Sequence, residues 1–185
     1  MANYYYFDIE TYGTEAKPNP QKDKIITIQF QEIDSQTGTP KSDLIIFKEW
    51  EHTEEAILRK FALMFKPWEF IPVGNNLNFE RAFLKIKSEQ YKIEAFTKHG
   101  DLAENFPSID VRPIFVILNK GQFKGSGMHN FTKKKTDGSH ISTWYANREY
   151  EKIENYITEE AEAFLEFYQK CSIELPKLFQ SHHKI

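Results

Sequence analysis

Residues 4–11, with the sequence YYYFDIET, are the part of the chain that decides the fold and points to its chemistry. The stretch is rich in aromatic and β-branched residues, which favours a β-strand. Side chains two positions apart on a strand point to the same face, so Asp8 and Glu10 are expected to lie together. Two carboxylates on one face repel each other, and a divalent cation, which prefers oxygen ligands, relieves that repulsion. An isolated pair of this kind is more often a solvated strand end, so the rest of the sequence decides between the two interpretations.

The composition is that of a globular protein without a basic character. The chain has 185 residues, of which 40% are hydrophobic and 15% aromatic, and its formal net charge is −3. This length predicts one domain over residues 1–185. The negative charge argues against a protein that coats nucleic acid by electrostatics alone. It is compatible with an enzyme whose acidic metal ligands offset a local basic surface.

Cysteine usage and hydropathy limit the cellular setting. Cys171 is the only cysteine, so no disulfide can form within the chain. The sequence shows neither a signal-peptide pattern nor an apolar run long enough to cross a membrane. We therefore expect a cytoplasmic protein without a membrane partner.

Hydrophobic periodicity predicts an α/β domain in which helices flank a mixed central sheet. In addition to residues 4–11, strands are expected at 24–33, 43–48, 70–74 and 108–111. Helices are expected from the N-cap Thr53 to Pro67, and at 78–91, 114–118 and 148–171. Residues 119–143 hold half of the glycines and are typical of loops around a short helix. The predicted order is β-β-β-α-β-α-β-α.

Two further acidic segments lie far from the first strand in the sequence. Residues 74–84, GNNLNFERAFL, turn from a strand into a helix and place Glu80 in the first helical turn. The helix dipole alone favours a carboxylate there. In the last predicted helix, Tyr156 and Glu160 are spaced i and i+4 and share a face. A glutamate on this apolar face is unusual without a partner, whereas the neighbouring Glu159 points elsewhere.

Taken in order, these segments resemble the DEDD superfamily of 3′→5′ exonucleases. The motifs are Phe-Asp-Ile-Glu-Thr at 7–11, Gly-x-Asn-x-x-Phe-acid at 74–80 and Tyr-x-x-x-acid at 156–160. The tyrosine is typical of the tyrosine-bearing branch, and the chain is most similar to the proofreading domains of family B DNA polymerases and their stand-alone relatives. The resemblance also includes residues 109–114 and 137–139, and it covers roughly residues 4–172.

The resemblance implies a ribonuclease H-like fold, with the first three strands antiparallel and the others roughly parallel. It also implies that two divalent ions, Mg²⁺ or Mn²⁺, are bound by Asp8, Glu10, Glu80 and Glu160, and that Tyr156 orients the attacking water. The implied reaction removes nucleoside monophosphates from the 3′ end of single-stranded DNA by hydrolysis. Contacts to a 2′-hydroxyl cannot be read in the sequence, so RNA stays open as a substrate.

Two of the four acids depart from the family pattern, which has aspartate in the second and third motifs. Glu80 and Glu160 each add one methylene, which moves a carboxylate by up to about 1.5 Å. A misplacement of about 1 Å can cost on the order of 100-fold in rate. The alternative function is therefore a catalytically weakened homologue that binds single strands in the same groove through aromatic stacking and local basic charge. A larger site also predicts a preference for Mn²⁺, because Mg²⁺ demands near-ideal octahedral geometry.

The histidines are not expected to act in catalysis. Neither His129 nor His140 has an acid five residues downstream, which argues against the histidine-bearing branch of the superfamily. His182 and His183 are expected to form a frayed tail.

Three other polar features receive a structural interpretation. Residues 121–127 are rich in glycine but lack the sequence pattern of a phosphate-binding loop. Asp110, near a strand end, is expected to form structural hydrogen bonds. The lysines at 133–135 are typical of a solvated loop, with phosphate binding as the alternative.

Overall fold

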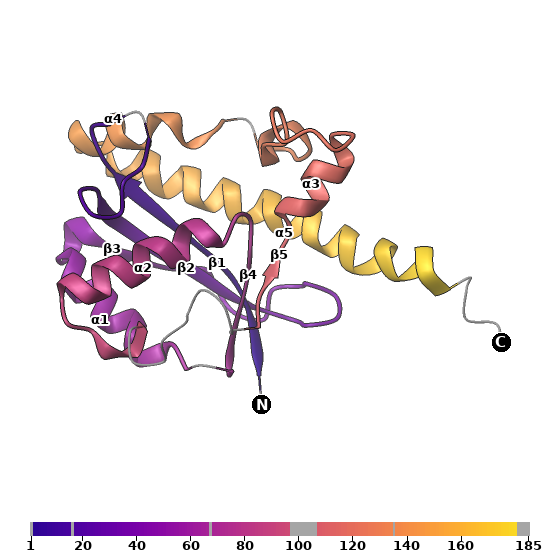
Figure 1. The fold of residues 1–185 in the computed structure, drawn as a ribbon, viewed down its shortest axis with the longest axis horizontal. Coiled ribbons are helices and arrows are strands. Elements are labelled where there is room, and N and C mark those ends of the chain that lie inside the picture. Colours follow the sequence, from indigo (N-terminus) through magenta and orange to yellow (C-terminus); the bar gives the residue numbers. More distant parts are fainter. Residues whose placement is uncertain (1, 16, 67, 97–106, 135, 181–185) are drawn as a thin grey trace.

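The computed structural model describes residues 2–15, 17–66, 68–96, 107–134 and 136–180. Its centre is a mixed five-stranded sheet with the strand order β3-β2-β1-β4-β5 (Figure 1). The strands are β1 (Asn3–Tyr12), β2 (Lys24–Ile33), β3 (Ile45–Lys48), β4 (Phe70–Gly74) and β5 (Ile109–Asp110). β1, β2 and β3 pair antiparallel, whereas β4 and β5 run parallel to β1. The predicted α/β fold and its mixed sheet are confirmed.

Helices cover both faces of the sheet. They are α1 (Glu54–Met64), α2 (Asn78–Gln90), α3 (Arg112–Leu118), α4 (Ile141–Ala146) and α5 (Tyr150–Gln180). The side chains of α1 and α2 share a hydrophobic core with one face of β1 and β2, and those of α3, α4 and α5 form two smaller clusters on the other face. Figure 1 shows α5 as the long helix that crosses the sheet. None of the described helices has the length and apolar character of a membrane span.

Alternation along β1 decides which face carries the acids. Phe7 and Ile9 are buried in the core beneath α1 and α2, whereas Tyr6 is buried against Phe164 of α5. Because a strand alternates its side chains, the residues in phase with Tyr6 point toward α5. Asp8 and Glu10 therefore lie on the α5 side of the central strand.

The predicted elements are all present, with some different ends. Thr53 caps α1 as expected, since its hydroxyl accepts a hydrogen bond from the Ala56 amide at 3.2 Å. The glycine-rich region predicted as loops around a short helix contains two 3₁₀ turns and runs into the short α4 at its end. The predicted end of the last helix near residue 171 is wrong, because α5 continues through Pro176 to Gln180. Residues after 171 include strong helix formers, and the exposed pair Glu174–Lys177 supports the extension.

Candidate active site

Three of the predicted acids meet at one point between β1 and α5. One carboxylate oxygen from each of Asp8, Glu10 and Glu160 lies within 4.8 Å of the other two. Asp8 and Glu10 come from the same face of β1, and Glu160 comes from the sheet-facing side of α5. All donors in this group are carboxylate oxygens, the ligand type that hard divalent cations prefer.

Glu80 lies beside this group and touches it through Asp8. Its side chain is only 3% exposed, and a hydrogen bond joins the carboxyl groups of Glu80 and Asp8. The other oxygen, Oε2, is buried without a hydrogen-bond partner among the described residues. A buried carboxylate oxygen without a partner is costly, so this atom fits the role of a cation ligand. The structure thus brings all four predicted acids into one region, with Glu80 at its edge.

Asp110 holds the start of the helix that carries Glu80. Its carboxylate accepts hydrogen bonds from the amides of Asn76 and Leu77, each at 2.9 Å, and from the Arg112 amide at 2.8 Å. These bonds satisfy donors at the beginnings of α2 and α3 with one side chain at the end of β5. The predicted structural hydrogen bonding of Asp110 is confirmed, and its effect is to fix the turn before Glu80.

Gly74, at the end of β4, permits the close approach of β4 to β1. A β-carbon at this position would lie 2.7 Å from the carbonyl oxygen of Phe7 and 2.6 Å from Cδ2 of Leu77. The first of these atoms is backbone and cannot move aside without shifting the strand. Glycine therefore lets the segment leading to Glu80 pass directly beside the residue before Asp8.

Two buried polar residues of β2 orient Asp8, and sequence reasoning missed both. Gln29 pairs with Asp8 across the strands, and its Nε2 donates a hydrogen bond to the Asp8 carboxylate at 3.2 Å. Thr27 in turn donates its hydroxyl hydrogen bond to Gln29 Oε1 at 2.9 Å. Both side chains are completely buried. The signal that could have revealed this support is that Thr27 and Gln29 share one phase and alternate with the apolar residues Ile26, Ile28 and Phe30 in the middle of the strand.

The acids perturb one another strongly. Burial, followed by the negative charge of Glu160, raises the pKa of Asp8 to about 7. Burial also raises the pKa of Glu10 well above its ordinary value, with further contributions from Asp8 and Glu160. The pKa of Glu80 is raised by burial and then by Asp8. Without a bound metal ion, the cluster therefore holds protons more tightly than free carboxyl groups do.

Tyr156 points its hydroxyl into the acid cluster. Its side chain is 6% exposed, and the hydroxyl forms hydrogen bonds with Glu160 and, at 2.5 Å, with the Lys134 ammonium, which donates. Burial, and then the charge of Glu10, raise the pKa of this tyrosine far above its ordinary value. The phenol therefore keeps its proton and can act as a hydrogen-bond donor. Its partners are groups of the site and not the backbone carbonyl expected of an ordinary core tyrosine.

The sequence also failed to predict that Lys134 is buried. Its Nζ lies 2.5 Å from Glu160 Oε1, and its side chain is only 8% exposed. The prediction of a solvated lysine loop is therefore wrong at this position. It fits Lys133, which is 80% exposed and pairs with Glu166 at 3.1 Å. Three consecutive lysines give no sequence signal that separates the buried one from its neighbours.

A groove opens beside Glu10. It has a volume of about 630 Å³, and its lining includes Glu10, Gly13, Phe79 and Ser139. This size is within the range of ligand-binding clefts.

Neither His129 nor His140 belongs to the acid cluster, and His140 instead stacks on Trp144 with ring centroids 5.6 Å apart. The tail residues 182 and 183 lie outside the described part of the chain.

Comparison with known proteins identifies the family and the fold of the chain. A family model described as RNase_H superfamily matches residues 5–171. The crystal structure of E. coli exonuclease I in complex with a dT13 oligonucleotide superposes with a TM-score of 0.64 and 11% identity, covering 98% of this chain and 43% of that one. The zinc-bound form of the E. coli ExoI–ssDNA complex gives a TM-score of 0.63, with 12% identity over 97% of this chain and 42% of that one.

A curated relative adds a sequence match. The DNA polymerase of Methanocaldococcus jannaschii is 26% identical over 95 residues, which are 48% of this chain and 5% of the polymerase. The chain spans less than half of the length of these structures and a small part of the polymerase. The chain belongs to the RNase_H superfamily. The predicted ribonuclease H-like fold is confirmed. The resemblance to DEDD-type exonucleases is confirmed at the level of the family.

The raised pKa values predict how stability depends on pH in the metal-free protein. A carboxyl group whose pKa is higher in the folded state stabilises the fold below its unfolded pKa of about 4. That contribution is lost as the pH rises through the folded value, about 7 for Asp8. With a chelator present, we expect the urea concentration at the midpoint of unfolding to decrease as the pH is raised from 5 to 8.

The Asp8→Asn variant serves as the comparison in these urea titrations, because an amide cannot ionise. We expect its unfolding midpoint to change less over the same pH interval than that of the wild type. Parallel pH profiles for the two proteins would contradict the linkage to Asp8.

Proposed function

We propose that this chain is a metal-dependent 3′→5′ exonuclease that hydrolyses phosphodiester bonds at the 3′ end of single-stranded DNA. The observation that carries the proposal is the meeting of Asp8, Glu10 and Glu160, with carboxylate oxygens within 4.8 Å of one another at the edge of a groove. Such a cluster gains nothing for stability by itself, since its members repel. Membership of the RNase_H superfamily and the fold shared with exonuclease I support the same assignment.

The proposal gives each site residue a role. Asp8, Glu10, Glu80 and Glu160 would hold divalent ions, Mg²⁺ or Mn²⁺, and the resemblance to the DEDD exonucleases implies two of them. Bound ions of this kind stabilise the charge on the attacking and leaving oxygens of a phosphodiester. The Tyr156 hydroxyl, protonated and directed at the cluster, would donate a hydrogen bond that orients the attacking water.

Charge in the groove favours the enzyme over a protein that only binds. A passive single-strand binder needs basic side chains along the phosphate backbone. The described residues that line the groove include no lysine or arginine, but they do include the acids Glu10, Glu15 and Asp23. A polyanion would be repelled by this lining unless cations held by the acids attract its 3′ phosphate. Phe79, which also lines the groove, offers a ring on which a base can stack.

The decisive experiment incubates 5′-labelled single-stranded DNA and RNA with the protein in Mg²⁺, Mn²⁺ or chelator. A 3′→5′ exonuclease shortens the labelled strand one nucleotide at a time, and chelator stops it. We expect cleavage of DNA, and the RNA arm decides whether the 2′-hydroxyl is tolerated. Asp8→Asn should lower the rate by at least about 100-fold, because losing even an outer-shell partner of a metal ligand costs about 10- to 100-fold. Binding of the labelled strand without shortening in either metal would instead support the weakened homologue.

Tyr156→Phe tests the water-orienting role. Loss of a positioning hydroxyl should lower the cleavage rate by about 10- to 100-fold, with little change in affinity for the single strand. Tyr168→Phe is a matched control, because Tyr168 lies on the same helix and is also 6% exposed, but packs against Phe164 away from the acids. Cleavage rate, strand affinity and melting temperature are measured on both variants. A loss of melting temperature with an intact rate would make Tyr156 a core residue only.

The glutamates predict a preference among metals. The longer side chains make the site larger than one built from aspartates, so we expect faster cleavage in Mn²⁺ than in Mg²⁺ at saturating concentrations. Glu80→Asp should reduce the ratio of the two rates, by up to about tenfold. Glu89→Asp, an exposed site on the same helix, is the control. Equal rates in both metals for the wild type would refute the effect of ligand length.

A further inference from the structure

We propose that Lys134 is a built-in cation of the metal-free site, and that binding of a divalent ion displaces its ammonium into an acidic groove along α5. This inference rests on the metal-binding part of the proposed function. It adds a competitor, carried by the chain itself, for the position that a metal ion would take.

The contacts of Lys134 place its charge among the acids. Its Nζ lies 2.5 Å from Glu160 Oε1 and 2.5 Å from the Tyr156 hydroxyl, and 4.4 Å from the centroid of the Tyr156 ring. The same positive charge acts on the carboxyl groups of Asp8 and Glu10. A lysine that is 8% exposed and has these partners compensates the repulsion that a metal ion would otherwise relieve.

A divalent ion and this ammonium compete for the same oxygens. Mg²⁺ or Mn²⁺ bound to Glu160 would sit close to any cation that remains on that carboxylate. Two like charges in a partly dry site repel strongly. Since Glu160 is shared by the three-oxygen group and by Lys134, metal binding has to weaken or break the lysine contact.

An acidic groove next to Lys134 can receive the displaced ammonium. This second groove, of about 360 Å³, is lined by Lys133 and Lys134 and by three glutamates of α5, Glu159, Glu162 and Glu166, so its acids outnumber its lysines. Rotation of the flexible lysine side chain would move the ammonium from Glu160 to the glutamates of this groove. The positive charge would therefore stay paired with carboxylates. The movement requires no change in α5.

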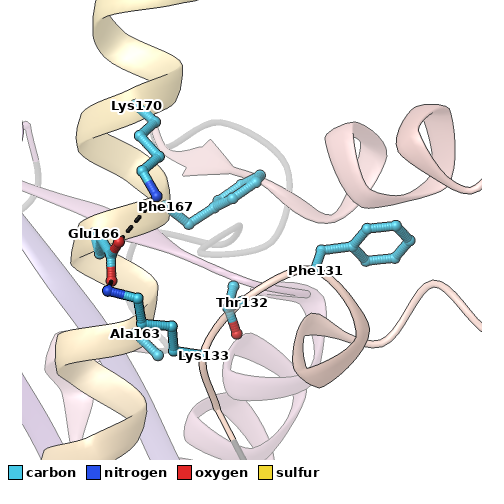
Figure 2. A pocket seen from close by; sticks show the side chains of 7 residues that line it. All are labelled: Phe131, Thr132, Lys133, Ala163, Glu166, Phe167 and Lys170. Atoms are coloured by element: carbon cyan, nitrogen blue, oxygen red, sulfur yellow. Dashed lines mark hydrogen bonds and ion pairs between the residues drawn. The ribbon is translucent and has the colours of Figure 1, made fainter.

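Lys133, the residue before Lys134, pairs with a different glutamate of α5 and lies outside the acid cluster. Figure 2 shows its side chain directed at Glu166, which also pairs with Lys170 from the same helix. The two nitrogen–oxygen distances are 3.1 Å and 2.9 Å. Consecutive lysines thus reach two different glutamates of α5, with Lys133 on the outer side and Lys134 on the inner side.

Calorimetric titration with Mn²⁺ tests the competition without using nuclease activity. Lys134→Met removes the competing charge, so we expect Mn²⁺ to bind at least about tenfold more tightly than to the wild type. Lys133→Met, which removes a neighbouring lysine outside the cluster, should leave the affinity unchanged. Equal or weaker binding by Lys134→Met, or no Mn²⁺ binding by either protein, would overturn the proposal.

Amine acylation of the wild type provides a test that does not depend on the folding of a variant. The protein is treated with an acylating reagent with and without Mn²⁺, and modified lysines are located by mass spectrometry. We expect acylation of Lys134 to increase several-fold with Mn²⁺, while Lys133 reacts equally in both samples. Unchanged protection of Lys134 in saturating Mn²⁺ would refute displacement.

Cleavage assays separate this inference from the proposed function. If Lys134→Met binds Mn²⁺ more tightly and no variant cuts a strand, the lysine competition stands and the nuclease assignment fails. If the wild type cuts and Lys134→Met loses activity without gaining metal affinity, Lys134 is a catalytic cation and the displacement proposal fails.

Discussion

The repulsion among four clustered carboxyl groups is the constraint on which the rest of this structure depends. Asp8, Glu10 and Glu160 meet on the covered face of a central strand, and Glu80 adds a fourth group against Asp8. Away from bulk water, charges of one sign cannot accumulate without protons or cations. Both means are available to this cluster, because burial raises the carboxyl pKa values and the Lys134 ammonium lies among the acids.

Holding repelling groups together requires a rigid frame, and the chain supplies it from elements far apart in sequence. Asp110 accepts three amide hydrogen bonds and fixes the turn into α2, while Gly74 allows β4 to approach β1 at contact distance. Gln29 orients Asp8 from the neighbouring strand. Each of these residues positions an acid, either through its hydrogen bonds or through the close approach that it permits. The stability of the sheet is thereby coupled to the geometry of the site.

Local spacing explains how much could be predicted from the sequence. The i, i+2 pair on a strand and the i, i+4 pair on a helix fix which side chains share a face, so Asp8, Glu10, Glu160 and Tyr156 could be placed within their elements. Glu80 could be placed by its position in the first turn of a helix. The supports depend on other information. Gln29 requires the strand register, and the burial of Lys134 depends on how a loop packs on α5. The continuation of the helix past residue 171 was missed because residues 173–178 are exposed, so hydrophobic periodicity does not mark this part of α5.

The structure gives a reason for one of the two departures from the family pattern, the glutamate at position 160. Glu160 contacts Lys134 with one oxygen while a carboxylate oxygen of the same residue lies within 4.8 Å of Asp8 and Glu10. An aspartate would withdraw the carboxylate by up to about 1.5 Å, away from at least one of these partners. The extra methylene therefore matches a site that contains a lysine in addition to its acids. Ligand length and the internal cation are then two parts of one arrangement, and the departure from aspartate does not by itself indicate a lost site.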